Sequence, residues 1–244
     1  GSRKGFFKYE KKNNGWKISA RGFLGDPVNL LMKDSRDGTL FGVLDHEHYG
    51  VKLHKSLDDG ETWEETETPQ YPDLPEEAVP SPDPEDAGKT YKPKLEKIWS
   101  LAPGGTAQPD TLWCGTLPGG LFISKDKGES WELVRSLWDR EERKQWMGVG
   151  AAYPALHSIC VDPRDHDNIV VGASTGGAWH SSDGGDNWFM TGKGMFAEYM
   201  DPESAWDPNV QDPHLIVQCA ANPDILWTQH HNGVFKTENR GGSW

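Results

Sequence analysis

The feature that most constrains the fold is an eight-residue pattern that occurs four times in the chain. It reads Ser/Thr-x-Asp/Asn-x-Gly-x-Ser/Thr/Asn-Trp, and its tryptophans lie 68, 57 and 56 residues apart. A single copy would be a weak signal, but five positions that recur at a nearly constant period indicate a tandem structural unit. The four copies are residues 56–63, 124–131, 181–188 and 237–244.

The side chains of this pattern suit a tight turn between two strands. The Asp or Asn side chain is expected to accept hydrogen bonds from backbone N–H groups two residues on, and Gly adopts a left-handed conformation without steric cost. The Trp opens the next strand and is expected to cover the junction between neighbouring units. The residues that we interpret as structural on these grounds are Ser56, Asp58, Gly60, Thr62, Trp63, Ser124, Asp126, Gly128, Ser130, Trp131, Ser181, Asp183, Gly185, Trp188, Thr237, Asn239, Gly241, Ser243 and Trp244.

Each unit extends upstream of the turn and reads as four short strands. A Gly-apolar-aromatic segment precedes the last three copies, as at residues 120–122, and β-rich runs such as 112–115 and 169–172 come earlier. Four-stranded units in tandem predict an all-β fold, a β-propeller of four-stranded antiparallel blades whose strands we name A to D from the axis outward. A two-sheet sandwich is the alternative fold, but it does not explain why the same turn motif recurs at the same position in every unit.

The repeat also predicts how the chain is divided. Residues 1–2 resemble the remnant of a cleaved tag, residues 3–244 form a single propeller domain, and residues 64–97 form an insertion rich in Pro and acidic residues. Residues 5–24 would supply half a blade, so we expect a longer natural protein with six or seven blades; a four-bladed ring is the alternative. The predicted full blades are residues 25–68, 95–136, 154–192 and 213–244.

The repeated turn resembles the Asp box of the BNR-repeat family. Over roughly residues 5–244, the chain is similar to Asp-box propellers such as sialidases, xyloglucanases, sortilin and a photosystem II assembly factor. The resemblance implies a sialidase-like propeller that binds a glycan or hydrolyses one. Sialidases also use an arginine triad, a Tyr–Glu pair and an Arg-Ile-Pro segment. This chain has eight arginines and no Arg-Ile-Pro, so the sialidase pattern is not found and the question of enzymatic activity stays open.

Histidines gather on one face of the predicted propeller. The B–C and D–A connections share a face, opposite to the repeated turns, and six of the nine histidines map to it. Imidazole beside carboxylate can bind Zn²⁺ or another divalent metal, act as an acid–base pair near neutral pH, or hydrogen-bond a sugar. The histidines that could hold a divalent metal are His46, His48, His230 and His231, and the two others on this face are His157 and His214.

Two long D–A connections, residues 132–156 and 189–214, are dense in aromatic, arginine and acidic side chains. Aromatic rings stack on pyranose rings, and Arg pairs with carboxylates in a fork, so these loops suit a sugar or an acidic ligand. Hydrolysis would need two opposed carboxylates, for which Glu47, Asp139, Asp207 and Asp212 are the candidates. The candidate ligand-binding residues on these loops, beside the six histidines, are Arg140, Trp146 and Tyr199.

Charge and cysteine content narrow the partners. The net charge of −13 argues against nucleic acid and anionic membranes as partners, because both are bound through basic surfaces. Three cysteines without paired spacing favour a reducing compartment, and therefore the cytoplasm over secretion, unless a signal peptide was removed. We predict that the B–C/D–A face binds a small polar ligand, first of all a glycan. The alternatives are a metal-dependent hydrolase or lyase that uses the histidines, and a non-enzymatic scaffold with a protein partner.

Overall fold

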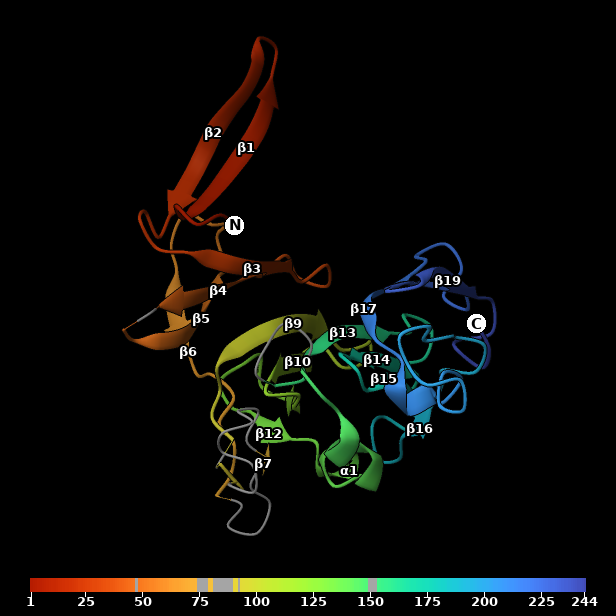
Figure 1. Cartoon of the computed structure of the whole chain (residues 1–244). Helices are drawn as coiled ribbons and strands as arrows, with labels where there is room; N and C mark the ends of the chain where they lie inside the picture. Colours follow the sequence, from red (N-terminus) through yellow and green to blue (C-terminus); the bar gives the residue numbers. More distant parts are fainter. Residues whose placement is uncertain (47, 74–78, 81–89, 92, 149–152) are drawn as a thin grey trace.

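The chain forms an arc of antiparallel sheets. The structure is a computed structural model that describes residues 1–46, 48–73, 79–80, 90–91, 93–148 and 153–244. Three four-stranded sheets and one three-stranded sheet follow one another in chain order, from β3 on one side of Figure 1 to β19 on the other. Their strands are β3 (Val28–Lys33), β4 (Leu40–His46), β5 (Gly50–Ser56), β6 (Glu64–Thr66), β9 (Lys97–Pro103), β10 (Leu112–Leu117), β11 (Leu121–Ser124), β12 (Glu132–Leu133), β13 (Leu156–Val161), β14 (Ile169–Ala173), β15 (Gly177–Ser181), β16 (Phe189–Met190), β17 (Pro213–Gln218), β18 (Leu226–His230) and β19 (Gly233–Thr237).

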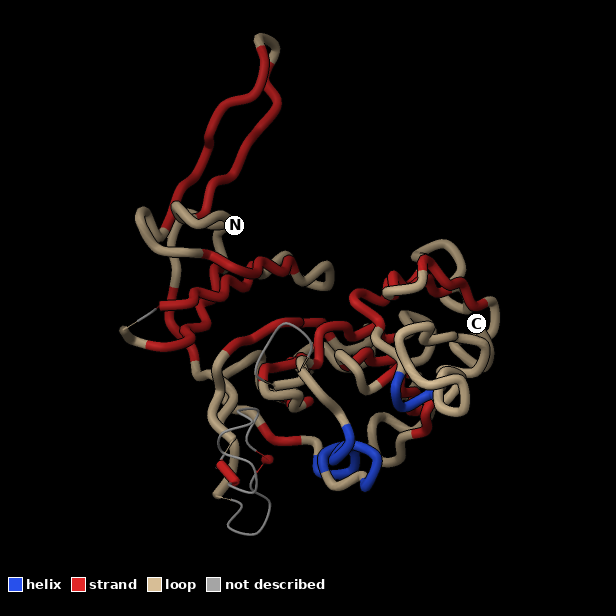
Figure 2. Tube along the Cα trace, viewed as in Figure 1, coloured by secondary structure: helices blue, strands red, loops and turns tan. Residues whose placement is uncertain are grey.

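Two hairpins and three short helical segments complete the structure. The hairpin of β1 (Phe6–Lys12) and β2 (Gly15–Gly22) projects away from the arc, and β7 (Val79–Pro80) pairs with β8 (Thr90–Tyr91). Helix occurs only in connections among the described residues, as Figure 2 shows. None of these helices is long and apolar enough to cross a membrane. The helical segments are α1 (Arg135–Trp138), η2 (Glu141–Gln145) and η3 (Pro208–Val210).

The first strand of each sheet lies on the inside of the arc. Strand β9 contacts both β3 and β13, and β13 contacts β17, so these four strands form the inner wall. Every residue of β10 and of β14 is buried, because each of these sheets is covered on both faces by its neighbours. Strand β17 instead leaves Leu215 and Val217 exposed while Ile216 is buried, since the described residues cover the fourth sheet on one face only.

The hydrophobic core is divided among the sheet junctions. One cluster lies between the first two sheets and includes Phe41, Leu53 and Phe122, and the next, between the second and third sheets, includes Trp179 and Trp188. Further clusters join the third sheet to the fourth, and the β1–β2 hairpin to the first sheet. Each sheet is therefore stabilised mainly by the units next to it, as expected for stacked repeats.

The repeated turns share two hydrogen bonds in all four copies: the first-position hydroxyl accepts from the glycine N–H, and the Asp or Asn side chain accepts from the seventh-position N–H. In the first copy the Asp58 carboxylate accepts from the backbone N–H groups of Glu61 and Thr62, at 3.1 and 2.9 Å. The expectation that the acid would bind the N–H two residues on was wrong. The reason is visible in the second copy, where the Ser124 hydroxyl accepts from the N–H groups of Asp126 and Gly128. The glycines at the fifth position have φ between 88° and 96°, the left-handed conformation that was predicted.

The tryptophans of the turns cover junctions with the preceding unit. The indole N–H of Trp131 donates to the Glu67 carbonyl at 3.0 Å, and that of Trp188 donates to the Ser136 hydroxyl at 3.2 Å. Trp63 packs edge-on against Phe6 of the hairpin, with ring centroids 5.1 Å apart. The turn motif therefore ends one hairpin and also attaches its sheet to the sheet before it.

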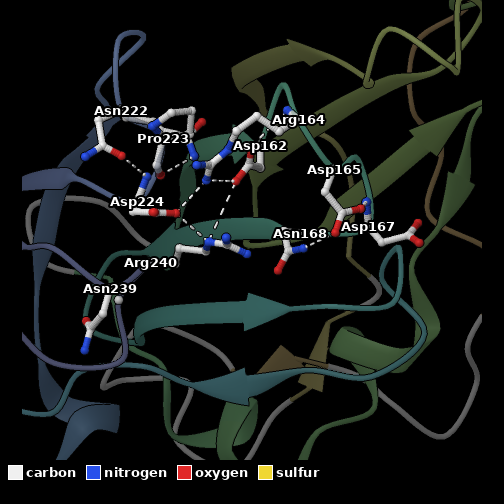
Figure 3. A network of polar contacts seen from close by, with 12 residues as sticks. Asp162, Arg164, Asp165, Asp167, Asn168, Asn222, Pro223, Asp224, Asn239 and Arg240 are labelled. Atoms are coloured by element: carbon white, nitrogen blue, oxygen red, sulfur yellow. Dashed lines mark hydrogen bonds and ion pairs between the residues drawn. The ribbon is translucent and has the colours of Figure 1, made fainter.

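A second repeated motif, which the sequence analysis did not identify, lies at the C-terminal ends of two inner strands. An Asp-x-Arg pair follows β3 and again β13, and in both places the Arg side chain forks onto the buried Asp carboxylate. Arg164 pairs with Asp162 at 2.7 Å and reaches Asp224 of the next sheet at 2.5 Å, where Arg240 also binds (Figure 3). These charged contacts tie the third sheet to the fourth.

Most of the predicted insertion over residues 64–97 lies outside the described residues. Its first part is attached to the second sheet by Tyr71, whose ring packs against Phe122 and Trp138 at 5.1 and 5.3 Å. The Tyr71 hydroxyl lies 2.6 Å from the Thr116 hydroxyl. This segment therefore begins as a packed connection and not as a solvated one.

Candidate functional site

Three side chains converge where the fourth sheet meets the third. Asp212 immediately precedes β17, His214 lies within it, and His231 follows β18. The Asp212 Oδ2 atom lies 2.7 Å from His231 Nε2 and 3.3 Å from His214 Nε2, and the two imidazole rings are 4.5 Å apart. One potential ligand atom from each residue lies within 4.8 Å of the others. These three residues could therefore hold a metal ion.

The strand register explains this convergence. Pro213 pairs with His230 across β17 and β18, which brings the residues at the ends of the two strands together. Asp212 and His214 are two residues apart at the start of β17, where the pairing with β18 is irregular between Pro213 and Leu215. The Asp-x-His spacing before a predicted inner strand is the sequence signal that could have singled out this pair.

The Asp212 carboxylate is buried and held in one orientation. Its side chain is 3% exposed, and its Oδ1 atom accepts the backbone N–H of Thr175, from the turn between β14 and β15, at 3.0 Å. The Asp212 N–H donates to His230 Nε2 at 3.0 Å. Both contacts fix the carboxylate so that Oδ2 faces His214 and His231. Those two side chains are 41% and 42% exposed, so the site opens to solvent on their side.

Two buried histidines flank the group. Burial lowers the pKa of His157 and of His230 to about 4, so both rings are neutral at pH 7. The His157 Nδ1 atom lies 2.7 Å from the Ser158 hydroxyl. Of the six histidines predicted on this face, four therefore lie at or beside Asp212, and two of these are packed inside.

The predicted metal ligands of the first sheet lie elsewhere. His46 pairs with Asp26 at 3.1 Å and packs edge-on against Tyr49, while His48 is exposed in the turn between β4 and β5. Figure 1 shows β4 and β19 on opposite sides of the arc. The structure thus joins His231 to Asp212 and His214, and not to His46 or His48.

Tyr199 forms one wall of the site. Its ring packs against His231 at 5.3 Å and against His230 at 6.3 Å, and its hydroxyl donates to the Val210 carbonyl at 3.0 Å. The side chain is 47% exposed, and partial burial raises its pKa to about 12. Tyr199 therefore offers a neutral aromatic surface next to the polar group.

The other two ligand-binding candidates on the loops have structural contacts. Trp146 is 7% exposed, and its indole N–H donates to Asn209 Oδ1 at 3.2 Å, which joins the two long D–A connections. Arg140 forms an ion pair with Glu142 at 2.7 Å, and its guanidinium lies 5.8 Å from the Trp179 ring centroid.

The three described candidate carboxylates lie in different places. Asp139 pairs with Arg135 at 2.9 Å, and Asp207 caps η3 by accepting the Asn209 N–H at 2.9 Å. Glu47 lies outside the described residues. Among the described candidates, Asp212 is the one that joins the histidine group.

An exposed tryptophan lies in the same loop as Tyr199 and was not among the predicted site residues. Trp206 is 61% exposed, and its ring packs against Phe196 at 4.8 Å. Glu198 of this loop exchanges hydrogen bonds with the Asn232 side chain, both at 3.0 Å, next to His231. The loop is therefore fastened to the turn that carries the histidines.

Comparison with curated proteins gives two partial matches, and no protein-family model matches the chain. The chain is 30% identical over 105 residues to a probable oligoxyloglucan-reducing end-specific xyloglucanase of Neosartorya fischeri. It is 29% identical over 80 residues to the oligoxyloglucan-reducing end-specific xyloglucanase of Emericella nidulans. The matches cover 42% and 32% of this chain but 11% and 9% of those proteins. The chain thus spans about a tenth of the length of the curated relatives it matches.

Solved structures show the likeness in fold. An ancestral GH74 enzyme matches with a TM-score of 0.56 and 17% identity, over 89% of this chain and 23% of that one. YCF48 from Cyanidioschyzon merolae matches with a TM-score of 0.55 and 11% identity, over 96% of this chain and 61% of that one. YCF48 bound to D1 peptide matches with a TM-score of 0.54 and 14% identity, over 94% of this chain and 57% of that one. The chain has a β-propeller fold. The predicted all-β propeller of four-stranded antiparallel sheets is confirmed, while the particular relation to sialidases and sortilin stays a prediction.

In this propeller fold, the site lies at the ends of the inner strands. Asp212 and His214 belong to the D–A connection and first strand of the fourth sheet, and His231 belongs to its B–C connection. The B–C connection of the third sheet adds the Thr175 amide. We refer to Asp212, His214, His231 and Tyr199 as the loop-face site.

Proposed function

We propose that the loop-face site binds a glycan. The observation that carries the proposal is the half-exposed Tyr199 ring against His231, which is itself 2.7 Å from the Asp212 carboxylate. A sugar presents an apolar ring face and polar hydroxyls, so an aromatic surface beside fixed donors and acceptors matches both. The partial sequence similarity to oligoxyloglucan-specific enzymes supports a carbohydrate as the ligand class.

The proposal concerns binding and not hydrolysis. Glycoside hydrolysis needs a pair of carboxyl groups on either side of the scissile bond. Among the described candidates, Asp139 and Asp207 are committed to an ion pair and to a helix cap, which leaves Asp212 alone in the group. One carboxylate with two histidines and an aromatic wall suits recognition of sugar hydroxyls.

The test is a glycan array that includes xyloglucan oligosaccharides, followed by calorimetry with the ligands found. Tyr199→Ala and Trp206→Ala should each weaken binding about two- to tenfold, because aromatic contacts contribute about 0.5–1.5 kcal/mol beyond the area that they bury. Trp16→Ala is the matched control, since Trp16 is 67% exposed on β2 in the projecting hairpin. Affinity should be unchanged in that variant.

The competing function is a scaffold that binds protein, and a structure with the same fold holds a peptide. A peptide array run in parallel separates the two classes. No affinity for any glycan, or glycan affinity that neither Tyr199→Ala nor Trp206→Ala reduces, would contradict the proposal. Peptide binding that these variants abolish would assign the loop-face site to the scaffold class.

A further inference from the structure

We propose that Asp212, His214 and His231 form a binding site for a divalent transition metal, with Zn²⁺ as the best-suited ion. The three potential ligand atoms lie within 4.8 Å of one another. This site goes beyond glycan recognition, because a sugar can bind at Tyr199 whether or not a cation is held beside it.

The ligand set indicates the kind of metal. Two imidazole nitrogens and one carboxylate oxygen suit Zn²⁺ and neighbouring transition metals, whereas Mg²⁺ and Ca²⁺ prefer all-oxygen sets. Three protein ligands also leave the fourth position of a tetrahedral Zn²⁺ site for water or a ligand. The exposure of His214 and His231, at 41% and 42%, puts that fourth position on the solvent side.

The distances are close to those of a metal site. Bonds of about 2.0–2.1 Å in a tetrahedron put neighbouring ligand atoms roughly 3.3 Å apart. The separation between Asp212 Oδ2 and His214 Nε2 is 3.3 Å. His231 Nε2 lies at 2.7 Å from the same oxygen, a hydrogen-bond distance, and must move away by roughly half an ångström. The half-exposed His231 side chain, in the turn after β18, can make this adjustment.

The Asp212 carboxylate is oriented by a neighbouring hydrogen-bond donor, as metal-binding carboxylates usually are. The Thr175 N–H occupies Oδ1 at 3.0 Å, so Oδ2 is left for the cation. The Asp212 side chain is 3% exposed. A cation at this position therefore compensates a buried negative charge. The alternative arrangement is the direct Asp212–His231 ion pair with no metal bound.

The experiment measures metal binding directly, without sugar. The whole chain is stripped with a chelator and titrated with Zn²⁺ by calorimetry and with Co²⁺ by visible absorption, which reports a tetrahedral site. We expect one equivalent of each metal to bind. Asp212→Asn should lower Zn²⁺ affinity by about 100-fold or more. Removal of a group that only hydrogen-bonds to a metal ligand usually lowers affinity by less, about 10- to 100-fold. His231→Ala should lower Zn²⁺ affinity as much as Asp212→Asn and lose the Co²⁺ absorption.

The chain supplies a matched control. The double variant His46→Ala/His48→Ala removes two histidines from the loop face of the first sheet and should leave Zn²⁺ and Co²⁺ binding unchanged. Because Asp212 is buried, Asp212→Asn could fail to fold, and the half-exposed His231→Ala then carries the test. Circular dichroism checks the fold of each variant.

The outcomes are distinct. Absence of Zn²⁺ binding, or binding that a folded His231→Ala variant retains in full, would overturn the metal site and favour the ion pair. Binding lost in the His46→Ala/His48→Ala control would overturn it as well, since the metal would then lie on the first sheet. Glycan affinity is measured separately, so glycan binding can fail while metal binding succeeds, and the reverse.

Discussion

At the scale of single residues, the acids of the repeated turns have a structural role. The Asp58 carboxylate accepts two backbone N–H groups and the Thr62 hydroxyl, and these hydrogen bonds, chiefly from Thr62, lower its pKa to about 2. Asp126 and Asp183 have equivalent partners and lowered pKa values. A carboxylate that is saturated with local donors holds a turn closed and is unavailable as a general acid at neutral pH.

The fourth copy of the turn suggests a test of this role. Asn239 replaces the acid there, and its Oδ1 accepts the Ser243 N–H at 2.9 Å, so the geometry needs an acceptor and not a charge. Asp126→Asn should therefore change the free energy of unfolding little, whereas Asp126→Ala should lower it by about 0.5–1.5 kcal/mol, because it removes the acceptor of the exposed Ser130 N–H and hydroxyl. Urea denaturation measures both. Equal stability of the Ala variant and the parent would contradict the structural role.

At the scale of elements, each sheet is held by its junction with the next. Trp188 illustrates this, because it immediately precedes β16 and is 2% exposed between the second and third sheets. Its indole N–H donates to the carbonyl of Gly185 at 3.0 Å as well as to Ser136. Trp131 has the same position in the second sheet but is only partly buried. The same turn residue therefore contributes unequally to different junctions.

Replacement of the junction tryptophans should reveal this inequality. Trp188→Ala should lower the free energy of unfolding by about 3–5 kcal/mol through the cavity it leaves. Trp131→Ala should cost less, because water already reaches part of its ring. The exposed Trp16→Ala should change stability by less than about 0.5 kcal/mol. Thermal and urea unfolding of the three variants compare them; an unaffected Trp188→Ala protein would rule out the packing argument.

At the scale of the whole molecule, stability is a sum of neighbour contacts along an arc. The described residues form four separate hydrophobic clusters, one at each junction. Charged contacts at the ends of the inner strands supplement them, as in the Asp162, Arg164, Asp224 and Arg240 network of Figure 3. The fourth sheet is thus attached to the rest by one apolar cluster, this network and the contacts around Asp212.

Loss of this network should loosen the fourth sheet. Arg164→Ala removes the link to Asp224 and leaves the 2% exposed Asp162 carboxylate without its forked partner. Because Arg164 is 45% exposed, solvent screening limits the expected loss of stability, and the effect should be local to the fourth sheet. In the Arg164→Ala variant, hydrogen exchange relative to the parent protein should accelerate more in β17–β19 than in β13–β15. Lys144→Ala, which breaks an exposed pair with Glu141, is the control and should have no measurable effect. Uniform exchange across all sheets would contradict this account.

The sequence by itself determined the class of fold and part of the chemistry of the turns. Four copies of one turn at one phase imply four similar sheets, and the left-handed glycine of the turn was also predicted correctly, whereas the N–H groups that the turn acid binds were not. The sequence also indicated that His157, His214, His230 and His231 share a face, because strand direction alone decides which loops lie at the same end.

Only the tertiary structure decided which of those residues meet. Asp212 and His231 are 19 positions apart and become neighbours through the pairing of Pro213 with His230. The amide that orients Asp212 comes from Thr175, in another sheet. Burial, too, depends on neighbours: it removed Trp146, His157 and His230 from the exposed surface, while Tyr199 and Trp206 remained open. The spacing of residues along the chain predicts the face on which a side chain lies. The distances between side chains of different sheets, which define a site, depend on how the sheets pack.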